Sequence, residues 1–178
     1  MILWAKMILL HKPQIQLFPS YMQFIVEMQK LGEVIWEDLI PKGPETPEIF
    51  INRLIRSQTK PEPNRVAEST YWAVIGDDVV GRICLRHELN AQLREFGGHI
   101  GYEVRPTFRR KGLTKEMLRN LLTAPETKSI GRILITCAPD NIASNKTILA
   151  NGGKLTEKRY VERFKRDTNY YWIDVGHE

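Results

Sequence analysis

Apolar residues recur every three to four positions in three stretches of the chain, and a fourth stretch ends at two glycines; these features predict four helices. Ser20 and Thr46 are suitable N-cap residues for the first two stretches. Glycines follow the first and the last stretch, as is typical of helix C-termini. The four stretches cover residues 20–31, 46–55, 114–122 and 140–151.

Short runs of apolar and β-branched residues predict the strands. The runs cover residues 8–10, 70–75, 79–86, 99–104, 130–137, 155–164 and 170–175. Turn residues predict two antiparallel hairpins, one about residues 76–78 and one about residues 167–169. Strand 99–104, helix 114–122 and strand 130–137 follow one another as a βαβ unit, in which the two strands should be parallel.

Length and composition indicate one globular domain over residues 1–178, with residues 1–6 as a loose N-terminal extension. The hydrophobic fraction is 42% and the charged fraction is 26%, which argues against disorder. No apolar run approaches the roughly 20 residues of a membrane span. Lys6 interrupts the apolar N-terminus, which therefore makes a poor signal peptide. We expect a cytoplasmic protein with no membrane partner.

Two cysteines, Cys84 and Cys137, lie inside apolar runs and are expected to be buried and reduced. Neither has the close Cys or His spacing of a zinc site, so no metal site is expected. The formal net charge of +5 suits an anionic ligand. No base-reading or aromatic-stacking motif accompanies the charge, and we therefore expect no nucleic-acid partner.

A basic turn lies between the predicted strand 99–104 and the predicted helix 114–122. The first amides of a helix have no intrahelical partner and attract anions, and a glycine in the turn lets the backbone approach a phosphate closely. The turn lacks the glycine spacing of a P-loop or of a dinucleotide-binding turn. It reads Arg109-Arg110-Lys111-Gly112-Leu113-Thr114.

This turn resembles the pyrophosphate loop of the GNAT acetyltransferases, R/Q-x-x-G-x-G/A. Arg109 and Gly112 match the pattern, and Thr114 replaces the usual glycine or alanine. A second resemblance follows the strand 130–137, where Asn141 and Ser144 match N-x-x-[AS] and Gly152 closes the helix. The alternative interpretation of the first motif is a solvated basic turn, and that of the second is a plain helix N-cap.

The resemblance implies the GNAT acyl-CoA N-acyltransferase fold, an α/β (α+β) architecture. Its mixed sheet is mainly antiparallel, with one central parallel βαβ unit and a slot between splayed strands for the cofactor. The order of predicted elements matches this fold along nearly the whole chain. The implied cofactor is acetyl-CoA, or CoA, and the residues implied to bind it are Val104, Arg105, Arg109, Arg110, Lys111, Gly112, Leu113, Thr114, Asn141, Ser144 and Asn145.

The implied reaction is direct attack of an amine on the thioester, which requires a base, a donor to the thioester oxygen and an acid for the leaving thiolate. The oxygen donor is expected near Val104. Base candidates are Glu103, His87, Glu88 and His99, and strand alternation should point Glu103 opposite to Tyr102 and Val104. Many relatives place a tyrosine acid where this chain has Ile148. Its possible substitutes are Tyr102, Tyr160 and Tyr171.

The acceptor remains open, as either a small-molecule amine or a peptide amine. Glu33, Glu37 and Asp38 would favour a cationic acceptor such as a polyamine if they formed an acidic cleft. A homodimer is also open, with pairing through the final strand 170–175. The alternative to an enzyme is a module that binds CoA as a sensor without turnover. The isoleucine at position 148, in place of the tyrosine of many relatives, supports this alternative.

Overall fold

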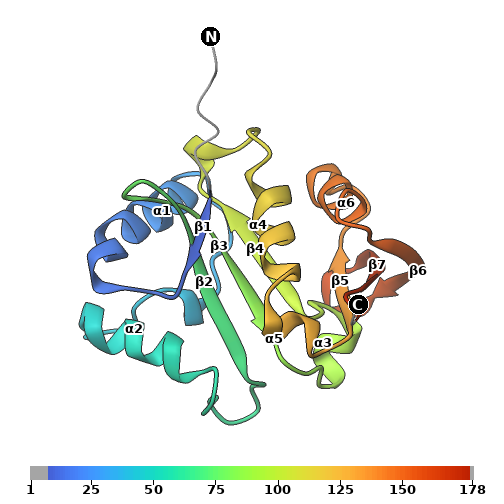
Figure 1. Cartoon of the computed structure of the whole chain (residues 1–178), viewed down its shortest axis with the longest axis horizontal. Coiled ribbons are helices and arrows are strands. Elements are labelled where there is room, and N and C mark those ends of the chain that lie inside the picture. The colour runs from blue at the N-terminus through green and yellow to red at the C-terminus, as the bar shows by residue number, and fades with distance from the viewer. Residues whose placement is uncertain (1–7, 177–178) are drawn as a thin grey trace.

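Within residues 8–176, which the computed structural model describes, seven strands form two antiparallel sheets (Figure 1). The larger sheet has the order β1-β2-β3-β4, and the smaller sheet has the order β5-β7-β6. The strands are β1 (Leu9–His11), β2 (Glu68–Ile75), β3 (Asp78–Arg86), β4 (Ile100–Val104), β5 (Arg132–Cys137), β6 (Lys154–Val161) and β7 (Arg166–Asp174).

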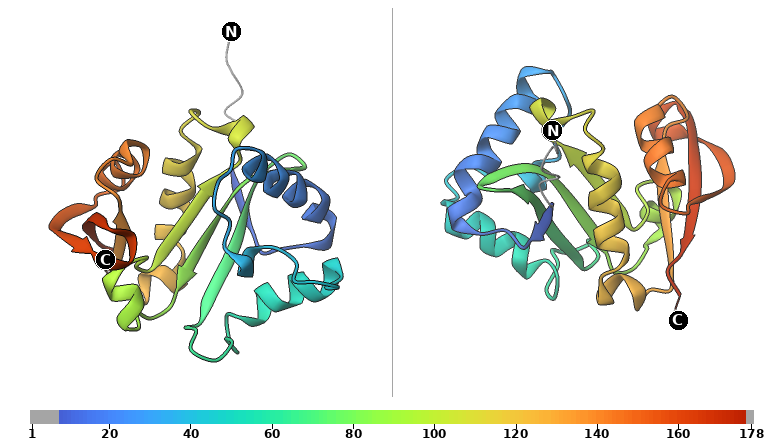
Figure 2. Two further views of the ribbon diagram at one scale, coloured as in Figure 1. Left: turned by 180° about the vertical axis from the view of Figure 1, so that it is seen from behind. Right: turned by 45° about the horizontal axis from the view of Figure 1, so that its top comes forward.

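Helices cover both faces of the larger sheet. Helices α1 and α2 pack on one face, and α4 packs on the other face between the two sheets (Figure 2). No helix in the described part of the chain is long and apolar enough to cross a membrane. The α-helices are α1 (Phe18–Lys30), α2 (Pro47–Arg56), α3 (Ala91–Glu95), α4 (Leu113–Leu122), α5 (Pro125–Lys128) and α6 (Ile142–Leu149).

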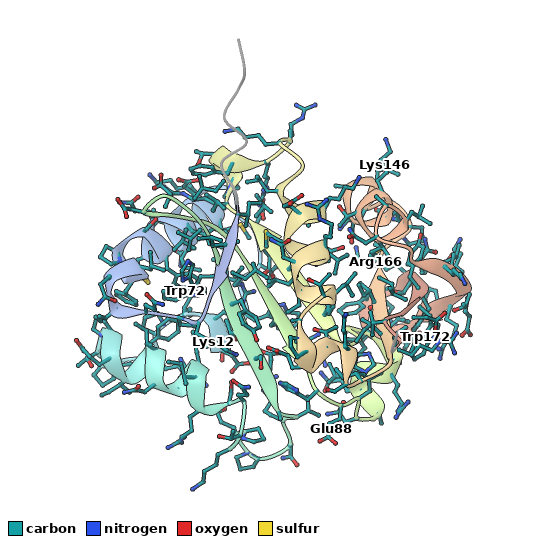
Figure 3. The ribbon with its side chains drawn as sticks, in the orientation of Figure 1. Lys12, Trp72, Glu88, Lys146, Arg166 and Trp172 are labelled. Carbon is teal, nitrogen blue, oxygen red and sulfur yellow. The ribbon has the colours of Figure 1, made fainter. Side chains whose placement is uncertain are left out.

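Two clusters of buried side chains hold these layers together. One lies between α4, the larger sheet and β5, and includes Leu118 and Ile133, which are both fully buried. The other lies under α1 and α2, where the rings of Tyr21 and Trp72 stack with their centroids 4.4 Å apart (Figure 3). Burial of this apolar surface is the main force that fixes the helices on the sheet.

Strands β4 and β5 run in the same direction, as the βαβ prediction requires, but they join at one point and then diverge (Figure 1). The joint is His99, whose backbone N–H donates to Leu134 O at 2.8 Å. Gly98 precedes it with φ +60°, and a Cβ on Gly98 would lie 2.4 Å from Leu134 O. Glycine is therefore required where the strands approach, and the space beyond the joint is the predicted slot.

Some predicted elements differ from the structure. The second hairpin turns at residues 162–165 and not at residues 167–169. The polar residues Thr168 and Asn169, which suggested the turn, are buried inside strand β7. Ser20 does not cap α1, since the helix begins at Phe18 and the Ser20 hydroxyl accepts a hydrogen bond from Val79 N–H instead. Helices α3 and α5 were not predicted because they are too short to show periodicity.

The prediction that the final strand could pair two copies is wrong. Strand β7 lies between β5 and β6, so both of its edges are already paired, and its residues Tyr170 and Tyr171 are buried. The exposed edge of the smaller sheet belongs to β6. The predicted extension, residues 1–6, lies outside the described residues.

Candidate functional site

A cavity lies beside the basic turn, between the end of β4 and the N-termini of α4 and α6. We call it the loop cavity. Its lining includes the predicted binding residues Val104, Arg109, Arg110, Gly112, Leu113, Thr114, Asn141 and Ser144. The two sequence motifs, which are 32 positions apart when counted from Arg109 to Asn141, therefore meet at one place in the fold.

The backbone of the turn carries a row of unsatisfied donors beside this cavity. Arg109 N–H bonds Pro106 O, and Glu116 N–H bonds Gly112 O. The six amides between them, residues 110–115, have no acceptor among the described residues. Gly112 is the N-cap of α4 with φ +76°, and no side chain caps the helix. Unpaired amides at the positive end of a helix dipole form an anion site.

The charged side chains of the turn do not all face the cavity. The guanidinium of Arg109 donates to both carboxylate oxygens of Glu33 at 2.5 and 2.7 Å, and its Nε donates to Val104 O at 2.9 Å. The Glu33 partner raises the pKa of Arg109, and Arg109 lowers the pKa of Glu33. Arg109 therefore fixes the turn against β4 and α1, and its charge is already neutralised.

Two further predicted binding residues lie outside the loop cavity. Arg105 is buried, its guanidinium donates to Glu27 at 2.7 Å, and its N–H donates to Val80 O. It holds α1 to the sheet and does not line the loop cavity. Lys111 does not line the cavity, and its ammonium lies 5.0 Å from the centre of the Phe108 ring.

Strand β4 directs two free amides into the space between the sheets. Arg105 N–H bonds Val80 O and Arg86 N–H bonds His99 O, so these alternate positions of β4 pair with β3. Amides alternate in direction along a strand, and those of Tyr102 and Val104 therefore point away from β3. This agrees with the expected position of a donor near Val104.

A second cavity is lined by β3, β4, the end of β5 and the segment between α1 and α2, and we call it the central cavity. It contains about 1380 Å³ of space, including open solvent at its mouth. The central cavity and the loop cavity share four lining residues. We call the place where these residues lie the junction of the two cavities, because a ligand in one cavity would contact a ligand in the other there. The shared residues are Tyr102, Glu103, Asn141 and Ser144.

Tyr102 and Ser144 form a hydroxyl pair at this junction. Their oxygens lie 2.7 Å apart, and either hydroxyl can be the donor. Burial raises the pKa of Tyr102 to about 12, so the phenol is protonated at neutral pH. Ile148, at the position of the family tyrosine, is fully buried. Tyr160 is exposed on β6, and Tyr171 donates to Asn145 Oδ1 at 2.5 Å, which leaves Tyr102 as the tyrosine of the junction.

Glu103 points from β4 toward the α1 and α2 side, as alternation predicted. Its carboxylate accepts a hydrogen bond from Arg82 Nη2 at 2.7 Å. Arg82 is only 6% exposed and lines the central cavity. The sequence analysis missed Arg82, although an arginine within the buried run 79–86 is itself a signal. The ion pair fixes the carboxylate at the junction of the two cavities.

Neither histidine nor Glu88 lies at the junction. His87 Nε2 lies 2.8 Å from Ser69 Oγ, and His87 lines neither cavity. His99 Nδ1 accepts a hydrogen bond from Leu134 N–H, and burial lowers its pKa to about 4. Glu88 is exposed at the opposite end of the molecule from the basic turn (Figure 3). The suggestion of His87 as a base is therefore not supported by its position.

The two asparagines of the second motif have different positions. Asn141 Oδ1 accepts a hydrogen bond from Ser144 N–H at 3.0 Å and so caps α6, while its amide nitrogen stays available in the shared part of the cavities. Asn145 turns away from both cavities. Its amide donates to Ala138 O at 3.0 Å, and its oxygen accepts from Asn169 and Tyr171. Asn145 therefore stabilises the loop of residues 138–141, which connects β5 to α6.

Both cysteines are free thiols, and both line the central cavity. Cys84 is buried as expected, and its burial raises the pKa to about 12. Cys137 is only partly buried, which differs from the prediction. Burial also raises the pKa of Cys137, so neither thiol is activated as a nucleophile. The described residues contain no group of His, Cys, Asp and Glu that could hold a metal.

Comparison with known proteins gives a family and a set of similar folds. A family model for the acetyltransferase (GNAT) domain matches residues 9–154. No curated protein matches the chain in sequence. The microcin C7 self-immunity acetyltransferase MccE, solved with acetyl-CoA and AMP, is 17% identical with a TM-score of 0.69, over 96% of this chain and 93% of that one.

Two further structures have the same fold. An acetyltransferase from Salmonella typhimurium that modifies the N-terminal serine of a 50S ribosomal subunit protein is 17% identical, with a TM-score of 0.66 over 96% of each chain. RimJ from Mycobacterium smegmatis, in complex with CoA-disulfide, is 16% identical, with a TM-score of 0.67 over 94% of this chain and 81% of that one.

Proposed function

The chain belongs to the GNAT acetyltransferase family, and we propose that it transfers the acetyl group of acetyl-CoA directly to a primary amine. The loop cavity receives the cofactor, and the central cavity receives the amine. Two of the similar folds were solved with acetyl-CoA or CoA-disulfide, and one modifies a peptide N-terminus. These relatives support the choice of cofactor and an amine acceptor.

One observation carries the proposal. The six amides of residues 110–115 have no acceptor among the described residues, and Arg110, Gly112, Leu113 and Thr114 line a cavity that meets a second cavity at four polar residues. Such a row of donors fits the pyrophosphate of CoA, because each amide oriented to an anionic oxygen regains a hydrogen bond. The open space around Gly112, where even a Cβ would meet nothing within 4 Å, agrees with a ligand beside the backbone.

The pantetheine arm runs from this site into the gap between β4 and β5 in the proposal. The free amides of Tyr102 and Val104 and the amide nitrogen of Asn141 supply donors along that path. When bound, acetyl-CoA supplies a thioester whose carbonyl carbon an amine can attack. An N–H on β4 then stabilises the negative charge that develops on the carbonyl oxygen.

The side chains at the junction provide the proton transfers. Glu103 accepts the proton that the amine loses, directly or through one water molecule, while Arg82 keeps the carboxylate in place. The hydroxyl pair of Tyr102 and Ser144 donates a hydrogen bond to the leaving thiolate. A phenol with a pKa near 12 is a weak acid toward a thiolate, since the thiol of cysteine has a pKa of only about 8.5. Stabilisation by a hydrogen bond is therefore favoured over complete proton transfer.

The proposal is tested by thermal shift and by release of CoA thiol on the same preparation. A ligand that binds only the folded chain raises the midpoint of unfolding by mass action, so acetyl-CoA and CoA should both raise it and ATP should not. Peptide and small-molecule amines are then screened for continuous thiol release. Binding without turnover on any amine would contradict the enzyme and favour the sensor alternative. Absence of a shift would contradict the binding site itself.

A further inference from the structure

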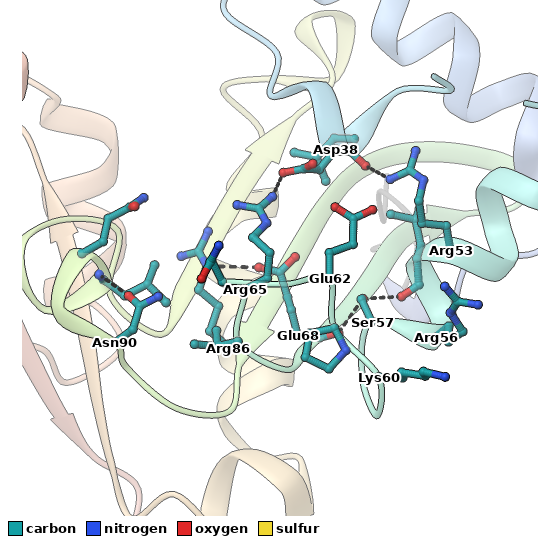
Figure 4. A pocket seen from close by; sticks show the side chains of 17 residues that line it. Asp38, Arg53, Arg56, Ser57, Lys60, Glu62, Arg65, Glu68, Arg86 and Asn90 are labelled. Atoms are coloured by element: carbon teal, nitrogen blue, oxygen red, sulfur yellow. Dashed lines mark hydrogen bonds and ion pairs between the residues drawn. The ribbon is translucent and has the colours of Figure 1, made fainter. Parts of the chain in front are cut away.

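A third cavity continues from the central cavity beneath α2 and the loop before β2, and we call it the side recess (Figure 4). It contains about 870 Å³ of space, including open solvent. Arg65, Glu68 and Arg86 belong to the lining of both, so one ligand can extend from the central cavity into the side recess. An acceptor that fills both is longer than a small amine.

The side recess is rich in cations, and its carboxylates are already paired. Glu68 accepts from Arg86 Nε at 3.1 Å, and Asp38 is paired with Arg65. The remaining carboxylate, Glu62, lies 3.6 Å from the ammonium of Lys42. Two of the three acidic residues that would favour a polyamine are neutralised in the same way, because Asp38 is paired with Arg65 and Glu33 is held by Arg109. The third, Glu37, is exposed and lines neither the side recess nor the central cavity.

Arg56 and Lys60 line the recess on the side of α2 (Figure 4). Neither has a carboxylate within ion-pair distance in the part of the chain that the structure describes. Their backbones are joined, since Lys60 N–H donates to Arg56 O at 2.8 Å. Both residues therefore lie at the C-terminal end of α2 and the turn that follows it, and both charges remain available to a ligand.

Arg86 adds a donor where the recess and the central cavity meet. Its side chain is 22% exposed, its Nε is bonded to Glu68, and its Nη1 donates to the carbonyl oxygens of Gly97 and Gly98 at 3.1 Å. Its Nη2 has no acceptor among residues 8–176. A fixed guanidinium with one free amino group is suited to a carboxylate or a peptide carbonyl oxygen.

We propose that the acceptor is the amino end of an acidic peptide, whose α-amino group reaches the junction at Glu103 and whose acidic side chains lie in the side recess opposite Arg56 and Lys60. This inference rests on the proposed function, because it assigns a substrate class to the same site. The two unpaired cations repel a polyamine and attract a carboxylate, and the shared lining of the two cavities lets one extended peptide occupy both.

The experiment measures direct binding of peptides, so that it does not depend on turnover. Short peptides of equal length, labelled at the C-terminus, carry two aspartates, two asparagines or two lysines at the third and fourth positions. Their binding is followed by fluorescence anisotropy in the presence of CoA. The variant R56Q/K60Q removes the two recess cations. The matched control R119Q/K128Q removes two exposed cations of α4 and α5 that line none of the three cavities.

We expect the wild type to bind the aspartate peptide roughly three- to tenfold more tightly than the asparagine peptide, because each of the two exposed charge pairs contributes only modestly. R56Q/K60Q should lose this preference, and R119Q/K128Q should keep it. Equal binding of the two peptides by the wild type, or a preference that survives in R56Q/K60Q, overturns the inference. A thermal shift with acetyl-CoA on the same samples separates this failure from failure of the proposed function.

Discussion

His99 and Leu134 are joined by two hydrogen bonds, one through the backbone and one through a side chain. His99 N–H donates to Leu134 O at 2.8 Å, and Leu134 N–H donates to His99 Nδ1 at 2.9 Å. The imidazole thus replaces a backbone carbonyl as the acceptor for Leu134. This pair is the joint between the two sheets, and the space beyond it is where the proposed cofactor arm lies.

The joint should weaken at acidic pH, because Nδ1 accepts a hydrogen bond only when the imidazole is neutral. Burial comes first among the causes that lower the pKa of His99 to about 4, followed by the positive charge of Arg94. The unfolded chain binds this proton near pH 6.5 and the folded chain near pH 4, so the stability contributed by neutral His99 is lost as the pH falls through this window.

Urea unfolding tests this prediction on the wild type and on H99Q. The difference between their free energies of unfolding should be largest at pH 7 and smaller at pH 4.5. The change is at most about 3 kcal/mol. A constant difference across this range would contradict the assignment of Nδ1 as the acceptor.

Gly112→Asp should weaken acetyl-CoA binding by about tenfold or more, because a carboxylate at the N-terminus of α4 opposes an anion there. The φ of +76° also strains any side chain, so some loss of stability is expected. Gly112→Asn is the matched control, since asparagine has a similar size and tolerates a left-handed backbone. Calorimetry should show much weaker binding for G112D than for G112N. Equal affinities would mean that charge at this position does not matter.

Tyr102→Phe should lower kcat by roughly 10- to 100-fold and change the KM for acetyl-CoA little, because the lost hydroxyl acts on the leaving group. Tyr160→Phe, on the exposed strand β6, is the control and should keep full activity. Thiol-release kinetics measure both. Normal turnover of Y102F would mean that the Tyr102 hydroxyl is not needed to stabilise the leaving thiolate, which would leave Ser144 as the only donor of this pair.

Glu103→Gln should lower kcat by about 100-fold and leave acetyl-CoA binding unchanged. Glutamine can still accept the hydrogen bond from Arg82, so a fold defect is not expected to dominate. The control is Glu88→Gln, an exposed position outside the cavities, which should keep full activity. A kcat of E103Q equal to that of the wild type would remove Glu103 as the base.

Periodicity and turn residues predicted most of the fold, because most helices and strands bury one face against the two cores. The α2 start at Thr46 and Pro47 was predicted correctly, since Thr46 Oγ1 accepts from Ile49 N–H. The second hairpin turn was misplaced because Thr168 and Asn169 are polar but buried, and Asn169 donates to Asn145 Oδ1. A partner distant in sequence satisfies this polar group, and no local pattern reveals it.

The motifs located the anion site, but they did not show which groups of the turn remain free. Arg109 matches the motif, yet its guanidinium is consumed by Glu33, 76 positions away in the sequence. The free donors are backbone amides, which every residue possesses and which only the geometry distinguishes. Tyr102 was one of three tyrosine candidates in the sequence, and its contact with Ser144 distinguishes it from the other two. Arg82 became a candidate only after folding brought Glu103 to it.

The central claim is that the backbone amides of residues 110–115 hold the pyrophosphate of acetyl-CoA, and a nitrogen–proton NMR titration tests it most directly. The amide signals of the wild type are followed as CoA is added, with ATP as a control. We predict that the largest shifts fall on residues 110–115, with smaller shifts on Tyr102 and Val104 and none of that size with ATP. Signals of residues 110–115 that stay unchanged while CoA binds would contradict the account.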